Sequence, residues 1–320
     1  MKVLANDGIS QSGIDKLTAA GLEVHTDHIP QDELISKIND LGYVGILVRS
    51  ATKVRKDIID ACPNLKFVGR GGVGMDNIDV AYGREQGLHV FNTPAASSQS
   101  VAELVMAHLF SMARNSFDSN RQMPVSGDTE FKVLKKKYAK GVELRGKTLG
   151  IVGFGRIGKA TATYALGAGM KVIACDKYST EGAVQWHIEG AGTVQVSVPM
   201  VSFDELLSKS DFISLHVPKQ DDGSAVLASA EFEKMKDGVC LVNAARGGVI
   251  EENDLITALN SGKIKFAALD VFENEPTPRK EILTHPQIAL TPHVGAATGE
   301  AQDRIGEELA DQILSILQPA

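Results

Sequence analysis

The chain has 320 residues, of which 43% are apolar and 23% are charged, a composition typical of a globular protein long enough for two domains. Its formal net charge of −7 argues against a broad nucleic-acid-binding surface, and no apolar run reaches the length of a membrane span. The N-terminus "MKVLANDG" lacks a secretory signal, and three scattered cysteines (Cys62, Cys175 and Cys240) favour reduced, packed thiols in the cytoplasm over a catalytic thiol.

Short runs rich in valine, isoleucine and leucine alternate with helical stretches along the chain. In order they are "KVLA", "VGILV", "LKFV", "LHVF", "TLGIV", "KVIAC", "FISLHV", "VCLVNA", "FAALDV" and "IALTP". Nearly continuous apolar runs separated by helices indicate parallel strands that are covered on both faces. The predicted fold class is therefore α/β, with doubly wound parallel sheets.

A change in composition near residues 92–100 marks a domain boundary. The segment "NTPAASSQS" is rich in proline, serine and alanine, and "SVAELVMAHLFSMARN" after it reads as one long helix. Ser100 and Glu103 fit a capping box at the start of this helix. The basic, less regular "FKVLKKKYAKGVELRG" leads into the second series of strands, and "GEAQDRIGEELADQILSIL" forms the last predicted helix.

Two stretches contain the pattern G-x-G-x-x-G, and the second has every feature of a dinucleotide loop. It contains Gly153, Gly155 and Gly158 and follows a strand. Arg156 and Lys159 add positive charge, a regular helix follows, and the next strand ends in Asp176. Such a loop presents backbone N–H groups to a pyrophosphate, and the carboxylate accepts hydrogen bonds from the ribose. An acidic residue there favours NAD over NADP.

The first stretch, with Gly69, Gly71 and Gly74, does not fit a dinucleotide. Asp76 and Asp79 are expected to cap the first helical turn and to repel a pyrophosphate. The following strand ends in Asn92 rather than an acid. Backbone N–H groups near Val73 and Gly74 could still hold a smaller carboxylate, and a simple turn is the alternative.

Ligands of open α/β sheets bind beyond the carboxyl ends of the strands, where this chain places Arg49, His216, Arg246, Asp270 and His293. Arg246, among small residues and glycines, suits a cation that binds a carboxylate and polarises a carbonyl. His293 could carry the hydroxyl proton while a neighbouring carboxylate at position 275 fixes its ring, although most of the eight histidines should be structural or exposed. Asp270 is either a helix cap or a contact to the nicotinamide carboxamide.

The motifs "TLGIVGFGRIGK", "LHVP", "LVNAARGGVIEENDLITAL", "AALDVFENEP" and "LTPHVGAAT" together resemble the D-isomer-specific 2-hydroxyacid dehydrogenase family. With "RSATKV" and "VGRGGVGMDNID", the resemblance covers nearly the whole chain. It implies a Rossmann NAD-binding domain at residues 99–289 and a flavodoxin-like substrate-binding domain formed by residues 1–98 and 290–320. It also implies a homodimer built through the NAD-binding domain.

The resemblance assigns roles to individual residues. It implies a catalytic set of Arg246, Glu275 and His293, in which His293 accepts the proton of the 2-hydroxyl while hydride moves from C2 to NAD. The implied cofactor contacts are Gly153, Gly155, Arg156, Ile157, Gly158, Asp176, His216, Val217, Pro218, Ala244, Ala245, Asp270 and Gly295. The implied substrate contacts are Arg49, Ser50, Val73 and Gly74, and no metal is expected.

Within the family, "RSATKV", "GVGMDNID", "NAARGG" and "HVGAAT" resemble the phosphoglycerate dehydrogenase branch, which oxidises D-3-phosphoglycerate to 3-phosphooxypyruvate in serine biosynthesis. A phosphorylated substrate calls for extra cations, for which Arg49 and Lys53 are candidates. The run Lys135, Lys136 and Lys137 is either a further contributor or a solvated loop. Longer members carry a C-terminal domain that binds serine, and we expect no such feedback in a chain that ends at Ala320.

Two other functions remain as alternatives. An enzyme that acts on glyoxylate, hydroxypyruvate or another unphosphorylated 2-keto acid would use the same mechanism. A dinucleotide-sensing corepressor could use the same fold, but the sequence has no basic patch or disordered tail and retains the arginine, glutamate and histidine of the catalytic set.

Overall fold

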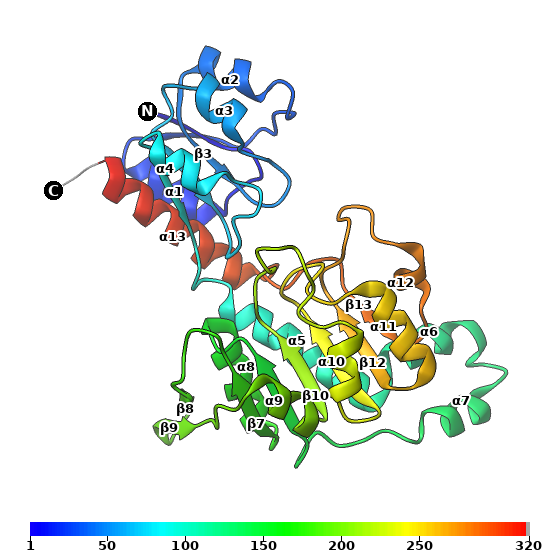
Figure 1. Cartoon of the computed structure of the whole chain (residues 1–320). Helices are drawn as coiled ribbons and strands as arrows, with labels where there is room; N and C mark the ends of the chain where they lie inside the picture. Colours follow the sequence, from blue (N-terminus) through cyan, green and yellow to red (C-terminus); the bar gives the residue numbers. More distant parts are fainter. Residues whose placement is uncertain (318–320) are drawn as a thin grey trace. The chain divides into compact units, whose positions relative to one another are not determined.

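The computed structural model describes residues 1–317 and divides the chain into two compact units (Figure 1). The first unit contains Met1–Ser98 and the C-terminal segment from Ala296, and the second contains Gln99–Gly295. The C-terminal crossing at Ala296 lies later than the expected one at residue 290. Residues 290–295 belong to the second unit, where Asp270 and Ser100 bind the backbone of Val294 and Gly295. Residues 318–320 of the expected substrate domain lie outside the described residues.

The first unit is a parallel sheet with helices on both faces. Its strand order is β2-β1-β3-β4-β5, with strands β1 (Lys2–Ala5), β2 (Glu23–His25), β3 (Tyr43–Val48), β4 (Phe67–Arg70) and β5 (His89–Asn92). One face packs on α2 (Leu34–Leu41), α3 (Lys56–Ala61) and α4 (Val80–Glu85). The other face packs on α1 (Gln11–Ala19) and α13 (Gly299–Leu317).

Both ends of the described chain belong to the first unit because α1 and α13 pack side by side (Figure 1). Gly13 of α1 lies against the backbone of Gly306 in α13, where a Cβ at residue 13 would come within 2.8 Å of the Gly306 carbonyl oxygen. The contact therefore depends on glycine, which allows the two helix backbones to approach closely. Apolar residues of α13, among them Ile305 and Leu309, complete the core on this face.

The second unit is also doubly wound. Its parallel strands follow the order β13-β12-β11-β10-β6-β7 and comprise β6 (Thr148–Val152), β7 (Lys171–Cys175), β10 (Phe212–Leu215), β11 (Val239–Asn243), β12 (Ile264–Leu269) and β13 (Ile288–Leu290). One face packs on α5 (Ser98–Arg114) and α8 (Arg156–Gly167). The other packs on α9 (Phe203–Lys209), α10 (Ser229–Lys234), α11 (Glu252–Ser261) and α12 (Lys280–Thr284).

Two features of the second unit lie outside this sandwich. Strands β8 (Ala183–Ile188) and β9 (Gly192–Ser197) form an antiparallel hairpin, whose Trp186 packs against Gly167 at the end of α8. Helices α6 (Ser116–Ser126) and α7 (Phe131–Tyr138) pack on each other; α6 buries none of its residues and α7 buries Leu134. The lysine run lies on α7, so the expectation of a loop there was wrong; Lys137 pairs with Asp118 at 2.8 Å.

The predicted fold class is confirmed, since every predicted apolar run overlaps a parallel strand. The predicted capping box is wrong because α5 begins at Ser98, before Ser100. The Ser100 hydroxyl donates to the Gly295 carbonyl, and the Glu103 carboxylate accepts from Tyr164 of α8. Within residues 1–317, no helix combines the length and apolar character that crossing a membrane requires.

Candidate active site

The second glycine loop forms a tight turn between β6 and α8. Gly153 has a φ of 92°, and its N–H donates to the carbonyl of Cys175 on the neighbouring strand. A Cβ at Gly158 would lie 2.2 Å from the Gly153 carbonyl oxygen, so the first helical turn can sit on the loop only with glycine there. The predicted Arg156, Ile157 and Gly158 form the start of α8.

Asp176, directly after β7, fixes this turn. One carboxylate oxygen accepts from Phe154 N at 2.7 Å, and the other accepts from Tyr178 N and Ser179 N at 2.8 and 3.0 Å. A carboxylate offers about four acceptor positions, so these three bonds leave capacity for a further donor. The side chain therefore both organises the loop and remains able to accept a ribose hydroxyl.

The start of α8 fits the pyrophosphate of a dinucleotide. Its N-cap is Gly155, and no side chain caps the helix terminus. A Cβ at Gly155 would meet no heavy atom within 4 Å, so the space beside the first helical turn is open. The unsatisfied N–H groups of the first turn and the positive end of the helix dipole favour an anion in that space.

The other predicted cofactor residues of the second unit follow the carboxyl ends of its parallel strands. Because those ends meet at one edge of the sheet, the residues lie along the same edge as the glycine turn. His216, Val217 and Pro218 follow β10; Ala244 and Ala245 follow β11; Asp270 follows β12. Gly295 ends the loop after β13, where its N–H donates to Asp270.

His216 is half-buried, with its imidazole Nδ1 covered by the protein. Its Nε2 lies 2.9 Å from the Ser214 hydroxyl, and its Nδ1 is buried without a hydrogen-bond partner among the described residues. Burial lowers the pKa of His216 to about 4. The backbone of this residue also closes the glycine turn, since a Cβ at Gly153 would lie 2.5 Å from the His216 carbonyl oxygen.

Arg246 projects from a turn that Asn243 organises. The Asn243 side chain, buried at the end of β11, accepts from Ala245 N at 3.1 Å and donates to the Arg246 carbonyl at 2.9 Å. An Arg246 guanidinium nitrogen donates to the Ala245 carbonyl at 2.6 Å. The sequence did not indicate the role of Asn243, which depends on the turn that its own side chain closes.

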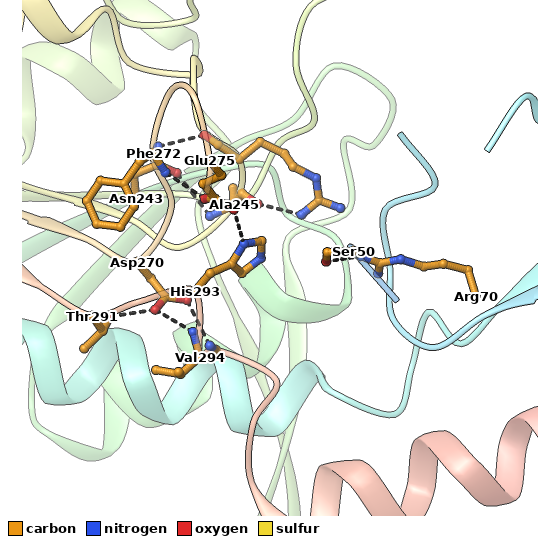
Figure 2. A network of polar contacts seen from close by, with 12 residues as sticks. Ser50, Arg70, Asn243, Ala245, Asp270, Phe272, Glu275, Thr291, His293 and Val294 are labelled. Atoms are coloured by element: carbon orange, nitrogen blue, oxygen red, sulfur yellow. Dashed lines mark hydrogen bonds and ion pairs between the residues drawn. The ribbon is translucent and has the colours of Figure 1, made fainter. Parts of the chain in front are cut away.

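Glu275 and His293 form a hydrogen-bonded pair (Figure 2). His293 Nδ1 lies 2.8 Å from Glu275 Oε2, and Phe272 N donates to Glu275 Oε1 at 2.9 Å. Burial alone would raise the pKa of Glu275, but the bonds from His293 and Phe272, with the nearby charge of Arg246, hold it below its usual value. The carboxylate is therefore ionised near neutral pH, and it fixes the imidazole ring so that Nε2 is left for another partner.

Asp270 binds the loop that carries His293 (Figure 2). Its Oδ1 accepts from the Thr291 hydroxyl at 2.6 Å and from Val294 N at 2.9 Å, and its Oδ2 accepts from Gly295 N at 2.9 Å. Asp270 thus caps a loop rather than a helix, and a carboxamide contact stays a prediction. His293 has a φ of 54°, a left-handed conformation that is uncommon outside glycine.

The predicted substrate contacts lie in the first unit. Arg49 and Ser50 follow β3, and the neighbouring β4 ends in Arg70, whose guanidinium donates to the Ser50 hydroxyl at 3.3 Å (Figure 2). Sequence reasoning missed Arg70, although its place at the end of a predicted strand was a usable signal. Val73 and Gly74 lie in the first glycine loop, which Thr93 anchors by accepting from Gly72 N at 2.8 Å.

The expected capping by Asp76 and Asp79 in this loop was wrong in its detail. Helix α4 begins only at Val80, and the Asp79 carboxylate accepts from Lys56 N of α3 and pairs with Arg55 at 2.9 Å. Arg55 also donates to the carbonyl of Asp76. The Asp79 carboxylate therefore faces α3 and Arg55 instead of its own helix.

The three cysteines lie in environments that favour unreactive, protonated thiols. Cys62, Cys175 and Cys240 are all free, and burial raises the pKa of Cys175 to about 11 and of Cys240 to about 12. Such thiols stay protonated and are poor nucleophiles. Residues 1–317 contain no group of three or more histidine, cysteine, aspartate or glutamate side chains arranged to hold a metal ion.

Comparison with known proteins gives consistent matches. The family model "D-isomer specific 2-hydroxyacid dehydrogenase, NAD binding domain" matches residues 106–295. A hydroxypyruvate reductase from Thermotoga maritima is 42% identical, over 99% of this chain and 98% of its own length. A D-3-phosphoglycerate dehydrogenase from Archaeoglobus fulgidus is 39% identical over 99% of this chain, which spans 57% of that protein.

A solved structure extends the likeness to three dimensions. The crystal structure of a glyoxylate reductase from Paecilomyes thermophila has a TM-score of 0.84 and 27% identity, over 100% of this chain and 96% of that one. The matched family domain covers the glycine turn and the Arg246, Glu275 and His293 positions. The chain therefore belongs to the D-isomer specific 2-hydroxyacid dehydrogenase family and is an NAD-dependent enzyme of that family.

Proposed function

We propose that Arg246, Glu275 and His293 catalyse hydride transfer between C2 of a D-2-hydroxy acid and NAD. The observation that carries this proposal is the 2.8 Å contact between His293 Nδ1 and Glu275 Oε2. The nearby charge of Arg246 also helps to lower the pKa of this carboxylate. These residues belong to one unit. The buried Asn243 side chain organises the turn of Arg246, and the buried Asp270 side chain holds the loop of His293. The arrangement provides a cation, a proton carrier and a carboxylate that orients it.

Each side chain has a distinct task in this mechanism. Arg246 binds the substrate carboxylate with its planar fork and polarises the neighbouring C2–O bond. His293 takes the hydroxyl proton on Nε2 during oxidation and returns it during reduction. Glu275 accepts from Nδ1, fixes the ring and stabilises the imidazolium. NAD, when bound, supplies the hydride acceptor.

Replacement of the proposed proton carrier tests the mechanism. His293→Ala is expected to lower kcat by about 10²–10⁴-fold, because it removes the acid–base group and leaves cofactor binding intact. The measurement is steady-state reduction of 2-keto acids with NADH, and the matched control is His187→Ala, an exposed histidine on the β8–β9 hairpin. A His293→Ala variant as active as the parent would show that another group carries the proton.

For the substrate we propose D-3-phosphoglycerate, which would be oxidised to 3-phosphooxypyruvate, with the first unit as the substrate-binding domain. Arg49 and Arg70 support a phosphate site, because they end adjacent parallel strands and therefore lie at the same sheet edge. The 39% identity to the D-3-phosphoglycerate dehydrogenase from Archaeoglobus fulgidus also supports D-3-phosphoglycerate as the substrate. Reduction of unphosphorylated hydroxypyruvate is the second candidate, and the 42% identity to a hydroxypyruvate reductase over nearly its full length favours it.

Kinetics on a substrate panel separates these two candidates. We expect 3-phosphooxypyruvate to have a higher kcat/KM than hydroxypyruvate or glyoxylate, with NADH preferred to NADPH. Arg49→Ala and Arg70→Ala should each lower kcat/KM by about 30-fold for the phosphorylated substrate and by less than about threefold for hydroxypyruvate, since each removes a charged contact to phosphate. The control is Lys66→Ala, an exposed cation before the opposite end of β4. Equal losses on both substrates would favour hydroxypyruvate.

We further propose a homodimer built through the second unit. Helices α5–α7 expose large apolar side chains that a monomer would leave in water, namely Phe110, Met123, Val125, Phe131 and Val133. Helix α6 buries none of its own residues, which suits a segment that packs against a partner.

The three free cysteines also support a reducing, cytoplasmic location, and three titratable thiols in freshly purified, unfolded protein would agree with it.

A further inference from the structure

Two side chains of helix α5 hold the loop that carries His293, one at each end of the loop. Ser100, in the first turns of the helix, donates to the Gly295 carbonyl at 2.7 Å. His108, about two turns further along, places Nε2 3.2 Å from the Thr291 hydroxyl. Both helix side chains are 5% exposed, so water does not replace these contacts. His293 lies between the two attachment points.

The contacts at the Thr291 end form a hydrogen-bond chain with a defined direction. The Asp270 carboxylate can only accept hydrogen bonds, so the Thr291 hydroxyl donates its single proton in the 2.6 Å bond to Oδ1. The same hydroxyl oxygen must then accept from His108, whose Nε2 carries the proton. The chain runs from His108 through Thr291 to Asp270, and Asp270 in turn holds Val294 N and Gly295 N.

We propose that His108 is a positioning residue for proton transfer at His293, acting through Thr291 and Asp270. The inference rests on the proposed role of His293. Its physical basis is the left-handed φ of 54° at His293, a conformation that an isolated loop would leave. The His108 donor orients the Thr291 hydroxyl, and both bonds of that hydroxyl restrain the loop in this conformation. His108 itself touches neither the pair of His293 and Glu275 nor Arg246 in any hydrogen bond of residues 1–317.

Substitutions at both ends of the His108 contact test the proposal. His108→Leu removes the donor and should lower kcat about tenfold, with the KM for NADH changed by less than about twofold, because the loss misplaces the proton carrier and not the glycine turn. His108→Gln, which keeps an amide donor, should recover kcat to within about threefold of the parent. Thr291→Val should lower kcat at least as much as His108→Leu, and the double variant should be no slower than Thr291→Val alone.

A solvent deuterium isotope effect on kcat separates positioning from a general structural role. It should increase in His108→Leu, since proton transfer becomes more rate-limiting, and return to the parent value in His108→Gln. The control is Met112→Leu, a volume-conserving change of a buried residue one turn along α5 without a polar contact to the loop. If His108→Leu does not fold, His108→Gln and the pair Thr291→Val and Thr291→Ser carry the same comparison.

The outcomes distinguish this inference from the proposed function. If His293→Ala abolishes turnover while His108→Leu matches the parent in kcat and isotope effect, His108 has no positioning role and the mechanism stands. Additive losses in the double variant would also overturn the inference, because they would place His108 and Thr291 in separate pathways. If His293→Ala retains full activity, the proposed function itself fails.

Discussion

The single side chain of His216 couples the stability of the protein to pH. The folded protein keeps this histidine neutral, because burial lowers its pKa to about 4 against an ordinary value of 6.5. An unfolded chain binds a proton at this position as the pH falls below 6.5, whereas the folded chain does not until about pH 4. The folded state must therefore lose stability as the pH falls through this window, and it regains that stability as the pH rises.

We expect this single group to remove about 2 kcal/mol from the free energy of unfolding between pH 7 and pH 4.5. His216→Gln, which has no proton to gain, should lose correspondingly less stability over the same range. Urea unfolding at both pH values measures the difference, and His187→Gln on the exposed hairpin is the control. Parallel losses in the parent and His216→Gln would show that other groups account for the acid sensitivity.

The side chains proposed to be catalytic could be predicted from the sequence, and the side chains that hold them could not. Arg246, Glu275 and His293 stand in long motifs that resemble a known family, and the structure pairs two of them at 2.8 Å. Thr291 and His108 lie 183 residues apart, and neither residue suggests its partner until the helix and the loop are packed together. Asp270 shows the same limit, because its three loop donors are contacts of folded backbone.

Among the structural elements, the β6–α8 turn contains two glycines whose surroundings differ. Gly158 lies against the backbone, where a Cβ would be 2.2 Å from the Gly153 carbonyl oxygen. Gly155 has an extended backbone with a φ of −77°, which any residue adopts, and open space at its Cβ position. Gly158 is therefore required by packing, whereas Gly155 leaves open space beside the start of the helix, where we propose that the cofactor approaches.

This difference predicts opposite outcomes for two conservative substitutions. Gly155→Ala should leave the unfolding free energy within about 0.5 kcal/mol of the parent and raise the Kd for NADH at least about tenfold, since the methyl group occupies the approach path. Gly158→Ala should cost about 1–3 kcal/mol of stability through overpacking. Chemical denaturation and fluorescence titration with NADH measure the two quantities. A Gly155→Ala variant that binds NADH like the parent would place the pyrophosphate elsewhere.

The prediction of strands is correct where the apolar runs are continuous. Parallel strands buried on both faces leave that signal, and all ten runs overlap observed strands. The β8–β9 hairpin was missed because its strands alternate in exposure, as in "AVQWHI", and a search for continuous apolar runs passes over them. The three-residue edge strand β2 is too short and too polar to leave a signal.

For the molecule as a whole, two units share one chain that crosses between them twice. The family resemblance supplied this organisation, and composition alone supported only the first crossing. The second crossing at Ala296 follows from the hydrogen bonds of Asp270 and Ser100 to the preceding loop, which no local pattern encodes. The exposed apolar residues of α5–α7 were likewise unremarkable until the fold left them on the surface.

We expect the protein to sediment as a species of twice its 34.1 kDa chain mass. Replacing Phe131 and Val133, which are 56% and 63% exposed on α7, with serine should shift it toward the monomer, because the pair would no longer contribute apolar contact area. Leu41→Ser, at an exposed apolar position of the first unit, is the control in analytical ultracentrifugation. A parent that sediments as a monomer at micromolar concentration would contradict the proposed assembly.

Trp186 is an intrinsic fluorophore at one defined position, between the β8–β9 hairpin and α8. It is the only tryptophan of the chain, and its indole rests on Gly167, where the hairpin meets α8. Indole emission shifts to longer wavelength as water reaches the ring, so a change in its spectrum reports whether the β8–β9 hairpin stays packed on α8. Because no other tryptophan contributes to the emission, the signal is read without an introduced label.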